Sequence, residues 1–322
     1  MVYKLSPNDR CPCDSGRRIK NCCWRRVDNS LRPRQARTFT PAPTTGYANA
    51  RCYAAPLNDC SPKISGEHTL SHSVLRELSP TGIIEVNALP GKPQDEFISV
   101  PIRVFTSNVL CDRHNGALSP LDVISHRFFK SLRAINAELR DKSKKPISRP
   151  YLFNGHDVER YILKILCGDG FANKLNAVSG RITGWRPSAQ WVRILYGLEP
   201  FPAGWGLYLA ATPGEPFDLD ENVLGICSVT NDYGKLCGAR FKVLGLEFEL
   251  LMIVPNPAQP RYSDNCRYRP NEVSFSDGRA TQSILFGWDV KGQGGTLHIE
   301  HITGTGQRTG APANNPSTNQ AA

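Results

Sequence analysis

The sequence lacks any apolar segment long enough to cross a membrane. A transmembrane helix needs about 18 or more consecutive apolar residues, and every apolar run in this chain of 322 residues is much shorter. The first residues also lack the apolar core of a secretory signal peptide. We therefore expect a cytoplasmic protein that has no membrane partner.

Acidic residues are scarce relative to basic ones. The chain has 29 Asp and Glu against 39 Lys and Arg, which gives a formal net charge of +10. The excess is concentrated in residues 1–37, which hold ten Lys or Arg against three Asp. A basic end of this kind suits a polyanion, although a solvated basic tail has the same composition. The predicted partner is nucleic acid, with DNA as the first expectation.

Cysteine, in contrast, is abundant and clustered. Seven of the eleven cysteines precede residue 112, and in a reducing compartment such clustering indicates metal binding rather than disulfides. Four thiolates close together in sequence can form a tetrahedron around one zinc ion, whereas a metal-free cluster of reactive thiols is the alternative. The first such group is Cys11, Cys13, Cys22 and Cys23.

Residues 8–24, which carry this group, resemble the SEC-C zinc motif, best known from the tail of the SecA translocation ATPase. The four cysteines are kept, but Asp14 and Trp24 stand where the motif usually has glycine. The resemblance implies a small zinc knuckle over residues 1–27 that docks a partner protein, and it implies no reaction. Residues 28–50, rich in Pro, Thr, Arg and Ala, are expected to be a linker.

A second group of cysteines ends in a Cys-x-x-His pair. Two paired knuckles are typical of a closed structural zinc site, and ordinary core thiols are the alternative. The predicted ligands are Cys52, Cys60, Cys111 and His114. The remaining cysteines have no knuckle spacing and are expected to be buried thiols; they are Cys167, Cys227, Cys237 and Cys266.

Polar residues beside these knuckles suggest chemistry. Glu67 and His68 lie between the two halves of the second group, and Asn115 follows it directly. Here residues 51–140 resemble the HNH (His-Me finger) nucleases, and in particular their zinc-knuckle branch. The resemblance implies a ββα unit in which His68 is the general base and Glu67 and Asn115 hold one Mg²⁺ or Mn²⁺. Asn108 is the nearest match to the middle Asn that orients the base in that family.

The residue types agree with hydrolysis of a phosphodiester. Such a reaction needs an activated water and a cation at the leaving oxygen. A neutral imidazole can accept a proton near pH 7, and oxygen ligands favour Mg²⁺ or Mn²⁺ over zinc. The expected metals are therefore two structural zinc ions and one catalytic Mg²⁺ or Mn²⁺.

Hydrophobic periodicity predicts an α+β fold. The two resemblances imply that it contains a small N-terminal zinc knuckle and a ββα-metal (HNH-like) domain, and the periodicity adds following helices and a C-terminal, mostly antiparallel β domain. Helices are expected over 69–78, from Ser119 to about residue 139 with Asp122 as a capping-box acid, over 157–167 with Gly168 as its end, and over 188–196. Strands are expected over 97–105, 205–211, 223–229, 241–254, 272–275, 283–288 and 296–302. This divides the chain into a helical segment at 141–200, a β-rich domain of unknown role at 201–302 and a disordered tail at 303–322.

Three functions remain open from the sequence. The leading hypothesis is a metal-dependent HNH-type endonuclease. The second is a non-catalytic protein that binds nucleic acid and keeps both knuckles as scaffolds. The third is an adaptor in which the SEC-C-like knuckle docks one protein and the β region recognises another.

Overall fold

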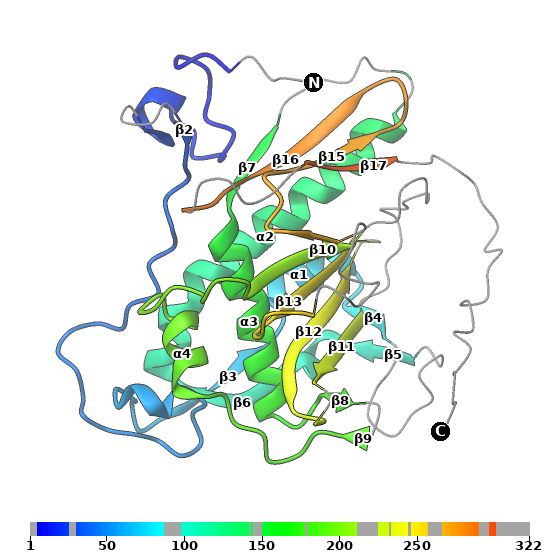
Figure 1. The fold of residues 1–322 in the computed structure, drawn as a ribbon. Coiled ribbons are helices and arrows are strands. Elements are labelled where there is room, and N and C mark those ends of the chain that lie inside the picture. Colours follow the sequence, from blue (N-terminus) through cyan, green and yellow to red (C-terminus); the bar gives the residue numbers. More distant parts are fainter. Residues whose placement is uncertain are drawn as a thin grey trace.

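The described part of the chain is an α+β fold (Figure 1). The computed structural model describes residues 5–25, 30–86, 98–141, 143, 150–177, 180–210, 225–231, 233–243, 246–256, 266–289 and 296–300. The expected tail at 303–322 lies outside these residues. Among the helices that the structure describes, none is long and apolar enough to span a membrane.

A ββα unit is formed by segments that are far apart in sequence. Strand β3 (Ile64–His68) pairs antiparallel with β6 (Thr106–Cys111), with His68 opposite Thr106. Strand β6 leads directly into α2 (Asp112–Arg140), and α2 packs against both strands. Between the two strands lie α1 (His72–Leu78), β4 (Ile83–Val86), β5 (Ile98–Pro101) and the 3₁₀ turn η3 (Ile102–Phe105). The strand expected over 97–105 is therefore limited to β5, because the chain bends at η3.

Helix α2 begins seven residues earlier than the Ser119 start that the sequence predicts. Ser119 and Pro120 resemble a helix start, but both lie inside the helix. Pro120 has no backbone N–H to donate to the Gly116 carbonyl. The Ser119 hydroxyl donates to that carbonyl instead, at 2.9 Å, so the helix continues through the proline.

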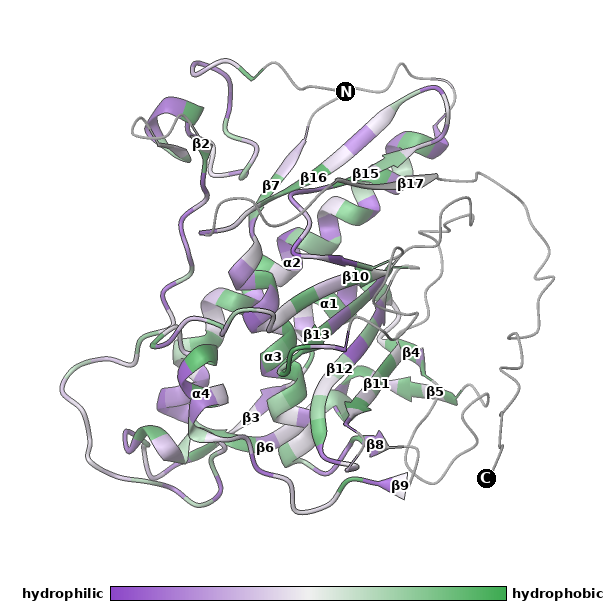
Figure 2. Ribbon diagram, viewed as in Figure 1, coloured by the Kyte–Doolittle hydropathy of each residue, from purple (hydrophilic) through white to green (hydrophobic). Residues whose placement is uncertain are grey.

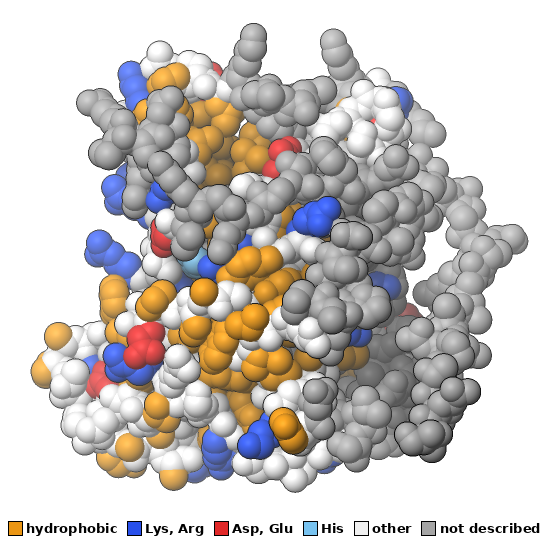
Figure 3. Space-filling view, in the orientation of Figure 1, with side chains coloured by type: hydrophobic (Ala, Val, Ile, Leu, Met, Phe, Trp, Pro, Cys, Tyr) orange, Lys and Arg blue, Asp and Glu red, His pale blue; other side chains and the backbone are white. Residues whose placement is uncertain are grey.

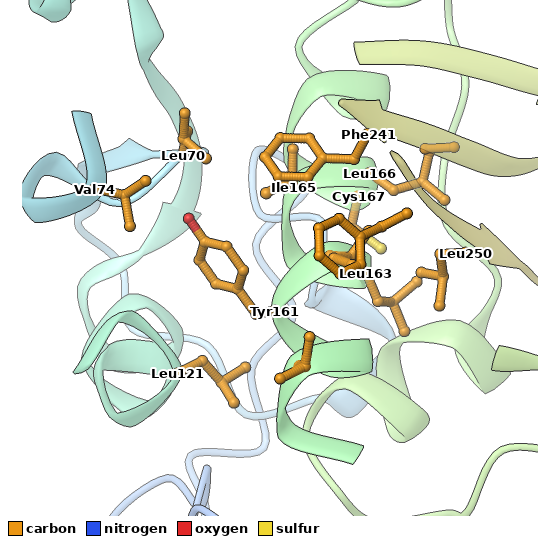
Figure 4. Close-up of a cluster of buried hydrophobic side chains, with 14 of the residues drawn as sticks. Leu70, Val74, Leu121, Tyr161, Leu163, Ile165, Leu166, Cys167, Phe241 and Leu250 are labelled. Carbon is orange, nitrogen blue, oxygen red and sulfur yellow. The ribbon is translucent and has the colours of Figure 1, made fainter. Parts of the chain in front are cut away.

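Helix α3 (Gly155–Phe171) is buried on every side. Its apolar residues pack among side chains from α1, α2 and the strands beside it (Figure 4), and Figure 2 shows its apolar stretches in the middle of the molecule. The helix does not end at Gly168 as predicted. A Cβ on Gly168 would lie 2.6 Å from the Thr69 methyl, and one on Gly170 would lie 2.6 Å from the Trp185 ring, so both glycines serve close packing.

The remaining helix has the predicted N-terminus. Helix α4 (Ala189–Leu195) begins after Ser188, whose side chain accepts a hydrogen bond from the Trp191 N–H. The short 3₁₀ turns η1 (Ile19–Asn21) and η2 (Ala55–Leu57) lie between the cysteines of the two groups.

The C-terminal strands form two sheets. The larger sheet is antiparallel and has the order β11 (Gly225–Thr230), β12 (Leu236–Val243), β13 (Leu246–Leu251), β10 (Gly206–Ala210) and β14 (Cys266–Tyr268). The strand expected over 241–254 is thus the end of one strand and the whole of the next. The second sheet has the order β17 (Thr296–Glu300), β15 (Glu272–Ser276), β16 (Thr281–Gly287) and β7 (Tyr151–Asn154). Two short hairpins pair β1 (Trp24–Arg25) with β2 (Ser30–Leu31) and β8 (Asn176–Ala177) with β9 (Gly180–Arg181).

One continuous cluster of buried apolar side chains extends from Cys52 to Trp288. It crosses the positions 140 and 200, at which the sequence suggests domain boundaries. Strand β7, from the expected helical segment, also pairs in parallel with β16 from the expected β-rich domain. The ββα unit therefore shares its core with the C-terminal strands.

The close approach of α3 to Thr69 gives a test of the packing. Gly168→Ala should lower the free energy of unfolding by about 1–2 kcal/mol, because the clash outweighs the better helix propensity of alanine. Gly116→Ala is the matched control, since a Cβ there meets nothing within 4 Å in α2. The control should be neutral or stabilising by up to about 1 kcal/mol in urea denaturation. A Gly168→Ala protein as stable as the control would contradict this packing.

Candidate metal centres and the His68 region

The second predicted ligand group forms a compact, buried cluster. The Nδ1 atom of His114 lies 3.5 Å from the Cys52 sulfur, 3.6 Å from that of Cys60 and 3.3 Å from that of Cys111. The four ligand atoms all lie within 4.8 Å of one another, and all four residues are buried. A tetrahedral zinc site with bonds of about 2.0–2.3 Å has ligand–ligand edges of roughly 3.3–3.8 Å. The observed separations of His114 Nδ1 from the sulfurs fit that geometry.

The elements that supply these ligands converge from three places. Cys52 and Cys60 flank η2, Cys111 ends β6, and His114 lies in the first turn of α2. The Ser61 N–H donates to the Cys111 sulfur at 3.3 Å, and the Tyr196 hydroxyl donates to the His114 carbonyl at 3.1 Å. A metal held here would fasten the 52–60 loop to the junction of β6 and α2.

The chemistry of the donors also fits a metal. Burial lowers the pKa of His114 to about 4, so its imidazole is neutral at neutral pH and one ring nitrogen has a free lone pair. Three sulfurs and one imidazole are the donor set that zinc takes in closed structural sites.

The first predicted group is also assembled. The Cys13 and Cys22 sulfurs are 3.4 Å apart, and all four sulfurs lie within 4.8 Å of one another. A hydrogen bond from Cys23 is the main cause that lowers the pKa of the Cys13 thiol to about 4. Asp14, which replaces a motif glycine, has φ 57°. Asp tolerates this left-handed conformation better than most residues, so the turn between the cysteines keeps the shape that glycine would give it.

This four-cysteine knuckle is packed onto the rest of the fold. Cys11, Ile19 and Cys23 are buried in a cluster with Leu152 of β7, and the Leu152 N–H donates to the Pro12 carbonyl at 3.0 Å. The chain that follows the knuckle is also fixed. The Asp157 carboxylate accepts from the Ala36 N–H, and Arg160 donates to the Ala36 carbonyl.

Within the described residues, these two groups are the sets of three or more His, Cys, Asp or Glu that can hold a metal ion. Of the four other cysteines, Cys167, Cys237 and Cys266 are buried as predicted. The prediction is wrong for Cys227, which is exposed. Cys227 lies on β11, the edge strand of its sheet.

His68 lies at the end of β3 and is partly exposed. Its Nε2 is 3.0 Å from the Thr106 hydroxyl oxygen, and its ring centre is 5.1 Å from that of His72. Burial is the largest cause that lowers the pKa of His68, and electrostatic repulsion from His72 and Lys164 acts in the same direction. The imidazole is therefore neutral at pH 7 and can accept a proton.

Glu67 lies on the opposite side of β3, because side chains alternate along a strand. Its carboxylate is buried and lies 2.5 Å from the Lys164 ammonium, which also lies 2.6 Å from the Asp122 carboxylate. Burial raises the pKa of Glu67 to about 7, against the opposing effect of Lys164. Asp122, expected to be a capping acid, is a partner of Lys164 because α2 starts earlier.

The two asparagines contact different residues of the β3–β6 ribbon. The Asn115 side-chain amide donates to the Ser65 hydroxyl at 2.9 Å, in the first turn of α2. Asn108 is exposed, and its Oδ1 lies 3.8 Å from the position of a Cβ on Gly66, beside the Thr106 methyl. Asn108 thus shares a face with His68 and Thr106, whereas Glu67 pairs with a lysine. The catalytic roles given to these residues stay predictions.

Sequence reasoning missed Lys164 altogether. No local signal marked it, because Lys164 falls outside the apolar face predicted for the 157–167 helix, and it is buried because α3 is enclosed on every side. Comparisons with family models, curated proteins and solved structures found no match to this chain.

The Cys₄ group and the Cys₃His group together predict how much zinc the purified protein contains. Protein purified without added metal should contain close to two zinc ions per chain by elemental analysis, one for each group. A ratio near zero, with the cysteines of both groups freely reactive toward a thiol reagent, would contradict the assignment.

The Cys₃His group should contribute directly to stability. Cys60→Ser should release one zinc ion and lower the free energy of unfolding by several kcal/mol, because metal binding is coupled to folding. Cys167→Ala is the control, since Cys167 is fully buried but belongs to neither group. It should cost about 1–2 kcal/mol and leave the zinc content unchanged. Equal zinc content in both variants would remove Cys60 from the ligands.

Proposed function

We propose that this protein is a metal-dependent endonuclease of the HNH type, which hydrolyses phosphodiester bonds of nucleic acid with His68 as the general base. The observation that supports it most is the placement of His68 on a β3–β6–α2 unit whose junction carries the Cys₃His group. That unit holds a neutral, partly exposed imidazole on a rigid strand. A rigid scaffold that presents a base is what hydrolysis of a resistant bond requires.

The residues around His68 support its role as a base. The Thr106 hydroxyl lies within hydrogen-bond distance of Nε2 and restricts rotation of the ring. The lowered pKa of His68 keeps it unprotonated at neutral pH. In this proposal Nδ1 takes the proton of the attacking water, and Asn108, on the same face, orients the base or the phosphate.

The proposed reaction also includes one divalent cation. Mg²⁺ or Mn²⁺ would offset the charge that builds on the phosphate and stabilise the departing oxygen. Glu67 and Asn115 are the ligands that the resemblance suggests. In the described structure the Glu67 carboxylate is paired with Lys164 and the Asn115 amide with Ser65.

The pairing of Glu67 favours a second candidate function. This candidate is a protein that binds nucleic acid without cutting it and keeps both metal knuckles as scaffolds. Such a protein does not need a free carboxylate beside His68. Binding of plasmid DNA without cleavage, in the presence of Mg²⁺ or Mn²⁺, would favour this candidate over the nuclease.

Basic side chains near the N-terminus support a polyanionic partner in either case. Arg10, Arg17, Arg18 and Lys20 are all exposed. In Figure 3, Lys and Arg side chains gather along the edge of the molecule that carries the N-terminal segment. Between residues 29 and 58 the chain has four arginines and no acidic residue, so the segment after the knuckle extends this basic character.

Loss of the proposed base should abolish most of the activity. His68→Ala should reduce Mg²⁺- or Mn²⁺-dependent nicking of supercoiled plasmid by at least ~10²-fold, the low end for removal of a general base. His126→Ala is the control, because His126 pairs with Glu77 away from this ribbon, and its nicking rate should match wild type. An active His68→Ala protein would contradict the assignment.

The lowered pKa of His68 sets the direction of the pH dependence. The rate should rise with pH as His68 loses its proton, and the midpoint of this acidic limb should lie below about 6.5, the ordinary value for histidine. Single-turnover nicking measured from pH 4.5 to 8 tests this. An acidic limb centred above that value would contradict a neutral His68 base.

The exposed basic residues should contribute to affinity but not to the chemical step. Replacing Arg17, Arg18 and Lys20 by glutamine should weaken DNA binding and reduce the slope of log K against log [salt] by up to about 0.9 for each lost contact. Arg193→Gln is the control, because Arg193 pairs with Glu199 at 2.5 Å. An unchanged salt slope in the triple variant would instead favour the knuckle as a protein-docking module.

A further inference from the structure

Lys164 is a buried cation next to the candidate base, and none of the predicted roles includes it. Its side chain is 1% exposed. The ammonium lies 2.5 Å from the Glu67 carboxylate and 2.6 Å from the Asp122 carboxylate. It also donates to the His68 carbonyl at 3.4 Å. Lys164 is thus the residue through which α3 forms ion pairs with both β3 and α2.

These partners explain why the lysine stays charged. Burying an ammonium without a counter-charge is costly, so isolated buried lysines lose their proton. Here the two carboxylates outweigh the effect of burial and raise the pKa of Lys164. Lys164 is therefore a permanent cation between the ribbon and α2, in contact with the carboxylate that the family resemblance assigns to a metal.

We propose that Lys164 is a positioning residue for His68. Its ammonium is the resident counter-charge of Glu67 and fixes the His68 end of β3 against α2 and α3, so that no divalent cation binds through Glu67. The proposal rests on the proposed function in that His68 is the reacting group. It changes the role of Glu67 from a cation ligand to a partner of Lys164.

The two faces of the β3–β6 ribbon agree with these separate roles of Glu67 and His68. Glu67 and Lys164 are buried behind β3, at 3% and 1% exposure. His68, Thr106 and Asn108 lie on the other face, where a substrate can reach them. A cation held behind the strand by Glu67 would have to displace an ammonium that is paired twice. The substrate and any cation bound with it are therefore handled on the His68 face.

Binding of Mn²⁺ tests the role of Glu67 without any measurement of activity. Titration of Mn²⁺ into the zinc-loaded protein, followed by the EPR signal of free Mn²⁺, should give the same Kd for wild type and Glu67→Gln, within about twofold. A tenfold or larger loss of affinity in Glu67→Gln would overturn the proposal. If neither protein binds Mn²⁺, the result would agree with the pairing of Glu67 and Lys164 but would contradict the divalent cation in the proposed nuclease reaction. The failure of one proposal can therefore be distinguished from the failure of the other.

Titration of His68 tests the role of Lys164. The charged groups that face His68 are His72 from α1, Asp122 from α2, Lys164 from α3 and Lys174 after α3. Lys164→Met leaves the carboxylates without their cation, so the pKa of His68, followed by NMR of its ring protons, should rise. Lys63→Met is the control, because Lys63 is 80% exposed in its pair with Asp112, and it should leave the titration unchanged. An unchanged His68 titration in Lys164→Met would overturn the proposal.

The double variant covers the case in which Lys164→Met fails to fold. Glu67→Gln with Lys164→Met removes both buried charges, so it should unfold at a higher urea concentration than Lys164→Met alone. If Lys164→Met does not fold, the double variant should still yield folded protein. A double variant no more stable than Lys164→Met would show that the lysine is not the counter-charge of Glu67, and would overturn the proposal.

Discussion

The Cys₃His group is the constraint on which the ββα unit depends. Its ligands come from a loop around η2, from the last residue of β6 and from the first turn of α2. Strands β3 and β6 form a two-stranded sheet, and such a pair needs packing beyond its own hydrogen bonds to be stable. A metal ion held by these four ligands would fix the strand, the helix and the loop at one point. The β3–β6 register at this junction places His68 opposite Thr106.

Buried charge on α3 is the second organising feature. A helix that is buried all round would ordinarily be apolar, yet α3 carries several charged residues, and some of them pair or hydrogen-bond with other parts of the fold. Arg160 pairs with Asp157 and reaches the chain after the N-terminal knuckle, whereas Glu159 pairs with Arg269 beyond β14. Breaking such a pair by removing one partner is strongly destabilising, because it leaves an uncompensated buried charge. Lys164, Glu159 and Arg160 thus join α3 to β3, to the residue after β14 and to the chain after the N-terminal knuckle.

Local features of the sequence predicted part of this structure well. Both ligand groups were predictable, because a knuckle places its cysteines close together in the chain and the metal requires that spacing. The N-cap of α4 was predictable for a similar reason, since Ser188 contacts the Trp191 N–H three residues away. In contrast, Ser119 and Asp122 wrongly indicated a helix start, because α2 already begins at Asp112 and continues through Pro120.

Features that depend on distant contacts were not predictable. Strand β7 is four residues long and is stabilised by parallel pairing with β16, which lies far along the chain. The expected strand over 241–254 combined two strands, because both are apolar and the sequence between them offers a single glycine as a turn signal. The pairing of Glu67 with Lys164 is likewise tertiary. Local sequence shows a carboxylate beside a histidine, whereas the ammonium comes from a helix about a hundred residues away.

X-ray absorption at the zinc edge tests the central claim, that two metal centres hold this fold together, most directly. A Cys₄ group and a Cys₃His group together supply seven sulfurs and one nitrogen. The spectrum of the protein as purified should therefore show a sulfur-dominated shell at about 2.3 Å with a small nitrogen contribution at about 2.0 Å. A shell made mainly of oxygen or nitrogen, or a protein that folds fully without metal, would contradict the account.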